Sequence, residues 1–195
     1  MIVLKLGGSL LSSSSLRKWL QLSVKQGKGK LVIVPGGGVF ADQVRSTQKQ
    51  WHYDEKTAHY MAILAMQQMA LLLNGLTEGL SIINKVNQIP TALANQQVVL
   101  WSPLASELDA GKIKPSWDVT SDTLSAWLAK QLSARNLLLV KSVQVMSGIS
   151  LDELSEQGIV DKAFASFMHE NPSLSFDCIP SSSSAYFSQY LEQHA

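Results

Sequence analysis

The chain has 195 residues, close to the size of one domain, and 46% of them are hydrophobic while 16% are charged. This composition excludes an intrinsically disordered chain and predicts a sizeable hydrophobic core. The 16 Lys and Arg residues nearly balance the 15 Asp and Glu residues, so we expect no broad basic surface for nucleic acid. The one cysteine, Cys178, excludes a disulfide framework and a multi-cysteine zinc site, and no metal-binding cluster is expected.

The apolar runs are short. The longest, such as residues 70–73, fall far short of the ~20 residues that span a bilayer. The opening residues MIVLKLGG lack the basic region and long apolar stretch of a signal peptide. We therefore expect a cytoplasmic protein with no membrane partner. The low charged fraction also predicts enough apolar surface for a homo-oligomer.

The chain opens with the pattern of a strand, a helix and a second strand. Ile2–Leu6 is a short apolar strand, and residues 31–34 form a β-branched run that is typical of a buried strand. Between them, residues 16–22 carry apolar side chains at helical spacing after a serine run that predicts a cap. A βαβ unit of this kind predicts a parallel sheet with a right-handed crossover.

The rest of the chain alternates in the same way. A long helix capped by Asp54 is expected to stop before Gly75. The remaining expected elements are strands over 98–101, 136–140 and 174–179 and helices over 120–132, 151–157 and 186–191. The fold class expected is α/β, a three-layer sandwich with a mainly parallel central sheet, in a single domain over residues 1–195.

Glycine-rich loops follow the first two strands. Residues 7–9 are Gly-Gly-Ser and residues 36–38 are Gly-Gly-Gly, and ligands of open α/β sheets bind at the carboxyl ends of the strands. Glycines allow a phosphate to approach the backbone closely. Neither loop matches GxxxxGK[ST] or GxGxxG, so neither a P-loop nor a standard dinucleotide fold is indicated. Lys5, inside the first strand, either reaches solvent at the strand end or faces a phosphate.

Residues 117–122 read Trp-Asp-Val-Thr-Ser-Asp. Thr120 and Ser121 are types that cap a helix, and Asp122 would lie in the first turn, where the helix dipole favours a carboxylate. That structural role accounts for these residues as well as a functional one does. If this helix opens onto the same sheet edge as the glycine loops, Asp122 is placed to hold lysines that face phosphates.

Several segments resemble the amino acid kinase family in order and spacing, from the first residue to about residue 165. They are VLKLGGSLL (3–11), VIVPGGGVFADQVR (32–45), DVTSDTLSAWLA (118–129) and NLLLVKSV (136–143). With the late VD-x-x-F at 160–164, the pattern is most similar to the branch that phosphorylates an aminomethylfuranmethyl phosphate in methanofuran-type cofactor biosynthesis. The resemblance implies the amino acid kinase fold, transfer of the γ-phosphoryl group of ATP, Mg²⁺ as a second cofactor, and a small phosphorylated substrate.

The resemblance also implies a role for each matching position. Lys5 faces the transferring phosphoryl group, Lys141 ends the strand on the nucleotide side, and Asp122 orients the lysines. The residues implied to bind the nucleotide are Gly7, Gly8, Ser9, Thr120, Ser121 and, in the VD motif, Asp161. The residues implied to receive the phosphoryl acceptor are Gly36, Gly37 and Gly38.

Two further residues keep two interpretations each. Arg45, on the helix after the triple glycine, either clamps an acceptor phosphate with two hydrogen bonds or lies in solvent. His59, among apolar residues of the long helix, either touches the acceptor or is a core histidine.

The sequence after the 136–140 strand departs from the family pattern. Residues 141–146 read Lys-Ser-Val-Gln-Val-Met, whereas the uridylate-kinase-like branch has a pattern close to Lys-Val-Asp-Gly-Val. The altered loop therefore leaves open a non-catalytic family member that binds a nucleotide or a phosphate. A second alternative keeps the chemistry and changes the acceptor, as in a uridylate- or amino-acid-type kinase.

Overall fold

The computed structural model describes residues 1–144 and 148–193, which are arranged around a six-stranded sheet in the order β3-β4-β2-β1-β5-β6. The strands are β1 (Ile2–Leu6), β2 (Leu31–Pro35), β3 (Leu80–Ile83), β4 (Val98–Trp101), β5 (Asn136–Lys141) and β6 (Ser175–Pro180). Each pair of neighbouring strands is parallel, so the predicted parallel sheet is confirmed. All carboxyl ends therefore lie at one edge of the sheet.

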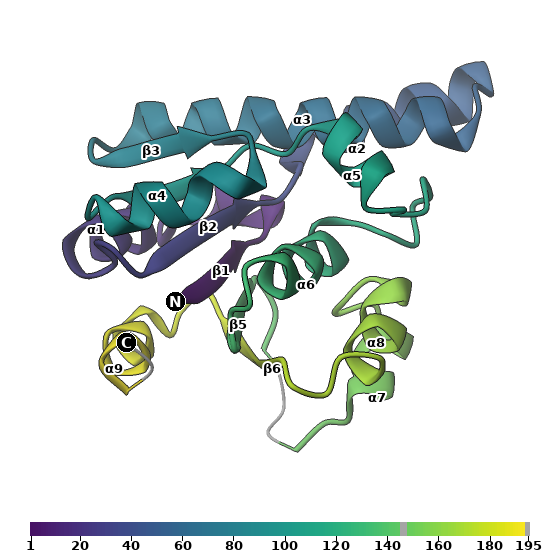
Figure 1. Ribbon diagram of the computed structural model, residues 1–195. Helices are drawn as coiled ribbons and strands as arrows, with labels where there is room; N and C mark the ends of the chain where they lie inside the picture. The colour runs from purple at the N-terminus through teal and green to yellow at the C-terminus, as the bar shows by residue number, and fades with distance from the viewer. Residues whose placement is uncertain (145–147, 194–195) are drawn as a thin grey trace.

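Helices cover both faces of this sheet, which gives the expected three layers (Figure 1). They are α1 (Leu16–Gln26), α2 (Gly38–Trp51), α3 (Glu55–Leu76), α4 (Ile89–Ala94), α5 (Ala105–Ala110), α6 (Ser121–Gln131), α7 (Leu151–Glu156), α8 (Lys162–His169) and α9 (Ser184–Gln193), with 3₁₀ turns η1 (Gly8–Ser12) and η2 (Val86–Gln88). None of the helices in the described ranges combines the length and the hydropathy that a bilayer crossing needs.

One face of the sheet packs against α1 and α9. Ile2 and Leu4 of β1 are fully buried on this face, in one cluster with Trp19 of α1 and Phe187 of α9. The rings of Trp19 and Phe187 lie 5.0 Å apart between their centroids. This cluster joins the last helix of the described chain to the first strand.

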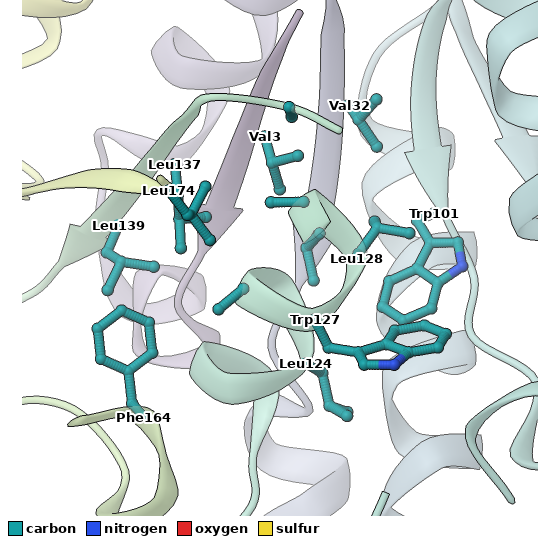
Figure 2. Close-up of a cluster of buried hydrophobic side chains, with 14 of the residues drawn as sticks. Val3, Val32, Trp101, Leu124, Trp127, Leu128, Leu137, Leu139, Phe164 and Leu174 are labelled. Carbon is teal, nitrogen blue, oxygen red and sulfur yellow. The ribbon is translucent and has the colours of Figure 1, made fainter. Parts of the chain in front are cut away.

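The other face is covered by α4, α6 and α8. Figure 2 shows Leu124 of α6 in the same buried cluster as Val3 of β1 and Leu139 of β5. Because side chains alternate along a strand, Lys5 and Lys141 project from the same face as Val3 and Leu139, two residues nearer the carboxyl end. The sheet therefore directs both lysines toward α6.

Two expected helix details are wrong. The α3 helix is capped by Asp54, as predicted, but it ends at Leu76 rather than before Gly75. Gly75 lies in open space near the helix end, where a glycine lowers helix stability without stopping the helix. The serine cap of α1 is not formed, because Ser15 has helical dihedral angles and its side chain makes no capping hydrogen bond.

Candidate active site

The two glycine-rich loops touch each other at the carboxyl edge of the sheet. A Cβ atom on Gly8 would lie 2.3 Å from the nitrogen of Gly38, and one on Gly36 would lie 2.5 Å from the nitrogen of Gly8. Neither position has room for a side chain. The Gly36 N–H donates to the Leu6 carbonyl at 2.8 Å, which holds the second loop against the end of β1. The loops after β1 and β2 therefore form one continuous backbone surface.

Two buried lysines share one buried carboxylate beside these loops. Asp122 Oδ1 lies 2.9 Å from Lys5 Nζ, and Asp122 Oδ2 lies 2.7 Å from Lys141 Nζ. The exposed fractions of Lys5, Asp122 and Lys141 are 5%, 4% and 9%. A Cβ atom on Gly7 would lie 3.5 Å from Lys5 Nζ, so this ammonium group lies directly under the first glycine loop.

Burial and charge have opposite effects on this cluster. Burial raises the pKa of Asp122, but the adjacent ammonium groups of Lys5 and Lys141 outweigh it and hold the pKa below its usual value. Burial lowers the pKa of Lys141, repulsion from Lys5 lowers it further, and the Asp122 carboxylate opposes both effects. Asp122 is therefore ionised at neutral pH. With both lysines protonated, the cluster carries one excess positive charge, which suits an anionic ligand.

A cavity of about 560 Å³ opens at the two glycine loops, and Lys5, Gly7, Asp122 and Lys141 are not among the described residues that line it. Nine residues predicted to bind ligands line it: Gly8, Ser9, Gly36, Gly37, Gly38, Arg45, His59, Thr120 and Ser121. Part of the wall is apolar and includes Ile63 and Met66 of α3 and Leu124 of α6. A cavity of this size with mixed apolar and polar walls suits a small molecule.

Arg45 is exposed, but it is held at the cavity by an aromatic ring. Its Cζ atom lies 4.4 Å from the centre of the Trp117 ring, and the Trp117 indole N–H donates to Gln48 Oε1 at 2.6 Å. Stacking engages the face of a guanidinium and directs its N–H donors outward in the plane. Trp117 also lines the cavity, although the sequence assigns it no binding role by itself.

His59 is both a buried histidine and a cavity residue, so its two interpretations are compatible. Burial lowers the pKa of His59, and the charge of Asp109 opposes this effect in part. The imidazole is therefore neutral at pH 7 and offers one hydrogen-bond donor and one acceptor.

Some of the residues expected on the nucleotide side line the cavity, and others do not. Ser142, directly after Lys141, lines the cavity, while residues 145 and 146 of the altered loop lie outside the described residues. Thr120 is the N-cap residue of α6, but its side chain makes no capping bond, contrary to expectation. The carboxylate of Asp161 binds the N-terminus of α6 instead, and Asp161 is not among the described residues that line the cavity.

Solved structures with a similar fold include uridylate kinases. The enzyme from Archaeoglobus fulgidus superposes with a TM-score of 0.74 at 20% identity, over 100% of this chain and 96% of that one. The UMP kinase of Bacillus anthracis gives 0.73 at 15% identity, over 99% and 92%. The UMP kinase of Ureaplasma parvum gives 0.69 at 18% identity, over 100% and 95%. At these identities the likeness establishes the fold, which is that of the amino acid kinases.

Sequence comparison gives a more specific relationship. The [5-(aminomethyl)furan-3-yl]methyl phosphate kinase of Methanocaldococcus jannaschii is 27% identical over 144 residues, which are 73% of this chain and 66% of that protein, slightly less than two thirds of its length. The profile of the amino acid kinase family matches residues 1–153, most of the chain. The chain therefore belongs to the amino acid kinase family.

Proposed function

We propose that the chain is a phosphotransferase that moves the γ-phosphoryl group of ATP to a small acceptor that already carries a phosphate. Residues 1–195 would act as one kinase domain, in the cytoplasm where ATP is available. The acceptor that we favour is an aminomethylfuranmethyl phosphate, because the relative from Methanocaldococcus jannaschii is named for that substrate. One observation carries the proposal: Asp122 holds the buried ammonium groups of Lys5 and Lys141 beside two joined glycine loops.

The reaction requires positioning and positive charge rather than covalent help from the protein. A phosphate oxygen of the acceptor attacks the γ-phosphorus of ATP, the bond from that phosphorus to the bridging oxygen breaks, and ADP leaves with the bond electrons. Lys5 and Lys141 stabilise the negative charge on the transferring group and on ADP, and Asp122 keeps the two ammonium groups apart. An acceptor phosphate is anionic at neutral pH, so no general base is needed.

The residues present fit the triphosphate of ATP. Backbone amides at Gly7, Gly8 and Ser9 and the two ammonium groups are donors that favour phosphate oxygens. The described residues contain no group of three His, Cys, Asp or Glu side chains arranged to hold a metal ion. Mg²⁺ commonly binds through substrate phosphates and water, and when bound to ATP it would supply further positive charge to the phosphates.

The cavity at the glycine loops is suited to the acceptor. Gly36, Gly37 and Gly38 would approach the acceptor phosphate with their backbone, and the guanidinium of Arg45 would bind its oxygens. The apolar wall formed by Ile63 and Met66 would contact a small ring. Neutral His59 can hydrogen-bond a polar group on that ring without adding charge.

A uridylate acceptor is the second candidate, because solved structures with a similar fold include uridylate kinases. A coupled assay of ADP release would separate the candidates, with the aminomethylfuranmethyl phosphate, UMP and free amino acids as acceptors. We expect fastest turnover with the furan phosphate. Turnover with UMP or with an unphosphorylated acid would select that alternative, and ATP binding without turnover on any acceptor would favour a non-catalytic protein.

A lysine variant tests the mechanism in the same assay. Lys5→Ala should stay folded and lose about 100-fold or more in kcat, since one such electrostatic contact contributes ~3–4 kcal/mol to the transition state. Lys25→Ala, which removes an exposed lysine from α1, is the matched control and should keep full activity. Full turnover by Lys5→Ala would show that the proposed electrostatic role is wrong.

The proposal includes a homo-oligomer. Apolar side chains are exposed along α2 and α3, with Trp51 72% exposed, Leu64 54% and Leu71 65%. A second copy of the chain covering these side chains would remove them from water. Sedimentation analysis should give a dimer or a larger assembly, and Leu64→Glu should shift the protein toward the monomer. A parent protein that stays monomeric at micromolar concentration would contradict this part of the proposal.

A further inference from the structure

The carboxylate of Asp161 accepts hydrogen bonds from three residues of two helices. Its Oδ2 atom accepts from the backbone N–H of Thr120 at 2.8 Å, the hydroxyl of Thr120 at 2.8 Å and the backbone N–H of Thr123 at 3.0 Å. Its Oδ1 atom accepts from the hydroxyl of Thr123 and from the backbone N–H of Phe164 at 3.0 Å. Both carboxylate oxygens of Asp161 are therefore occupied as hydrogen-bond acceptors.

These contacts place one carboxylate at the start of two helices. Asp161 is the N-cap residue of α8, and it also binds two of the N–H groups that have no acceptor within α6. The Ala163 N–H donates to the Asp118 carbonyl at 2.9 Å, a second tie between the start of α8 and the segment before α6. The first turn of α6 is therefore held by α8 through hydrogen bonds as well as by packing.

The held turn is the one that carries Asp122. Thr120 and Thr123, which both donate hydrogen bonds to Asp161, stand on either side of Asp122 in the sequence, while the Asp122 side chain forms ion pairs with Lys5 and Lys141. The buried cluster around Leu124 and Phe164 fixes the bodies of α6 and α8. The bonds to Asp161 fix the exact turn from which the Asp122 carboxylate reaches the lysines.

We propose that Asp161 is a positioning residue for phosphoryl transfer, which holds the first turn of α6 so that Asp122 keeps the two lysine ammonium groups in place. This inference rests on the proposed function and deepens it. It differs from the direct contact with the nucleotide that the family resemblance implies for Asp161. The residue acts through Asp122 and touches neither substrate.

The test begins with Asp161→Asn, which keeps the shape of the side chain but turns an N–H₂ group toward N–H and O–H donors. Because a misplacement of about 1 Å can cost ~10²-fold in rate, we expect kcat to fall about 10- to 100-fold. KM for the acceptor should stay within about 3-fold, since Arg45 and the triple glycine are held by α2 and β2. Circular dichroism at the assay temperature would establish that the variant is folded.

Asp54→Asn is the matched control. Asp54 caps α3 in the same way, accepting from the Thr57 N–H at 2.7 Å and from the Thr57 hydroxyl at 3.1 Å, without contact to the lysine cluster. This variant should lose some thermal stability and keep kcat within about 2-fold. If Asp161→Asn fails to fold, Thr123→Val provides the test, because it removes one hydrogen bond to Asp161 while the carboxylate and both caps remain. We expect kcat to fall severalfold.

A double-mutant cycle separates positioning from a general loss of structure. In the Lys141→Ala background, Asp122 has already lost one of its two lysines, so Asp161→Asn should lower kcat by less than it does in the parent. The inference would be overturned if Asp161→Asn lowered kcat by the same factor in both backgrounds. A folded Asp161→Asn protein with the parental kcat would also overturn it. A parent protein with no turnover would instead refute the proposed function, and the inference with it.

Discussion

Replacement of Asp122 with Asn tests the charge balance of the site most directly. The amide keeps the shape of the side chain, but it leaves Lys5 and Lys141, only 5% and 9% exposed, with no negative charge between them. Removing one partner of a buried ion pair costs about 3–5 kcal/mol. For a chain of this length, that corresponds to a fall in Tm of roughly 6–20 °C.

The loss of stability caused by Asp122→Asn should become smaller at low pH and again at high pH. The pKa of Asp122 is lowered in the folded state, so the stability that this group contributes is present above its unfolded pKa of ~3.9 and is lost as the pH falls through the lower folded value. In the variant, the pKa of Lys141 falls further because the opposing carboxylate is gone. A folded lysine pKa below the unfolded value makes stability rise with pH, so the deficit also shrinks toward pH ~10.

Thermal unfolding of parent and variant, followed by circular dichroism from pH 3 to pH 10, would measure this difference. The deficit should be greatest near neutral pH, and kcat should be lower by about 10²- to 10³-fold there. Asp118→Asn is the control, because Asp118 is exposed and pairs at 3.7 Å with an exposed lysine, Lys162. An Asp122→Asn protein with the parental Tm and kcat would refute the electrostatic argument.

Three further predictions concern single positions. Gly8→Ala should lower kcat/KM by about 10-fold or more, because its Cβ would lie 2.3 Å from the Gly38 nitrogen, whereas Gly75→Ala enters open space and should not; equal activities would contradict the joined loops. Burial raises the pKa of Cys178 to about 11, so iodoacetamide should label it slowly at pH 7 until the protein unfolds, as mass spectrometry would show. Trp117→Ala and Arg45→Lys should each raise KM for the acceptor about 10-fold with little change in kcat, since the first removes the ring on which the guanidinium stacks and the second removes the guanidinium itself; an unchanged KM would exclude that role.

The parts of the fold that were predicted correctly depend on local patterns. β1 and β2 are short apolar runs that are followed by glycine, and β5 contains a continuous apolar run. Each of these patterns indicates a buried parallel strand by itself. Lys5 was notable for the same reason, since an ammonium group inside such a strand needs a partner. The pairing of Asp122 with lysines followed from its place in the first turn of a helix that opens onto the same edge.

The parts that were missed depend on tertiary contacts. β3 is an outermost strand of the sheet and is only half-buried, and Ser81 interrupts its apolar pattern. The stacking of Arg45 on Trp117 joins residues far apart in the chain, and no local pattern indicates it. The hydrogen bonds from α6 to the Asp161 carboxylate form only where α8 packs against that helix, so the family motif that contains Asp161 does not indicate them.

The proposed function requires a nearly neutral chain to bind a polyanion. With a net charge of +1, the protein has no large overall positive charge that would attract one. It places two ammonium groups on adjacent parallel strands, where burial strengthens their interaction with a phosphate. Two unpaired charges there would repel each other and destabilise the sheet, and Asp122 removes that cost while it leaves one positive charge in excess. A second carboxylate in contact with the lysines would cancel that excess. Asp161 lies behind the α6 turn and is bonded to backbone N–H groups and hydroxyls instead of to the ammonium groups, so under the proposed function the excess charge would stay available to a phosphate.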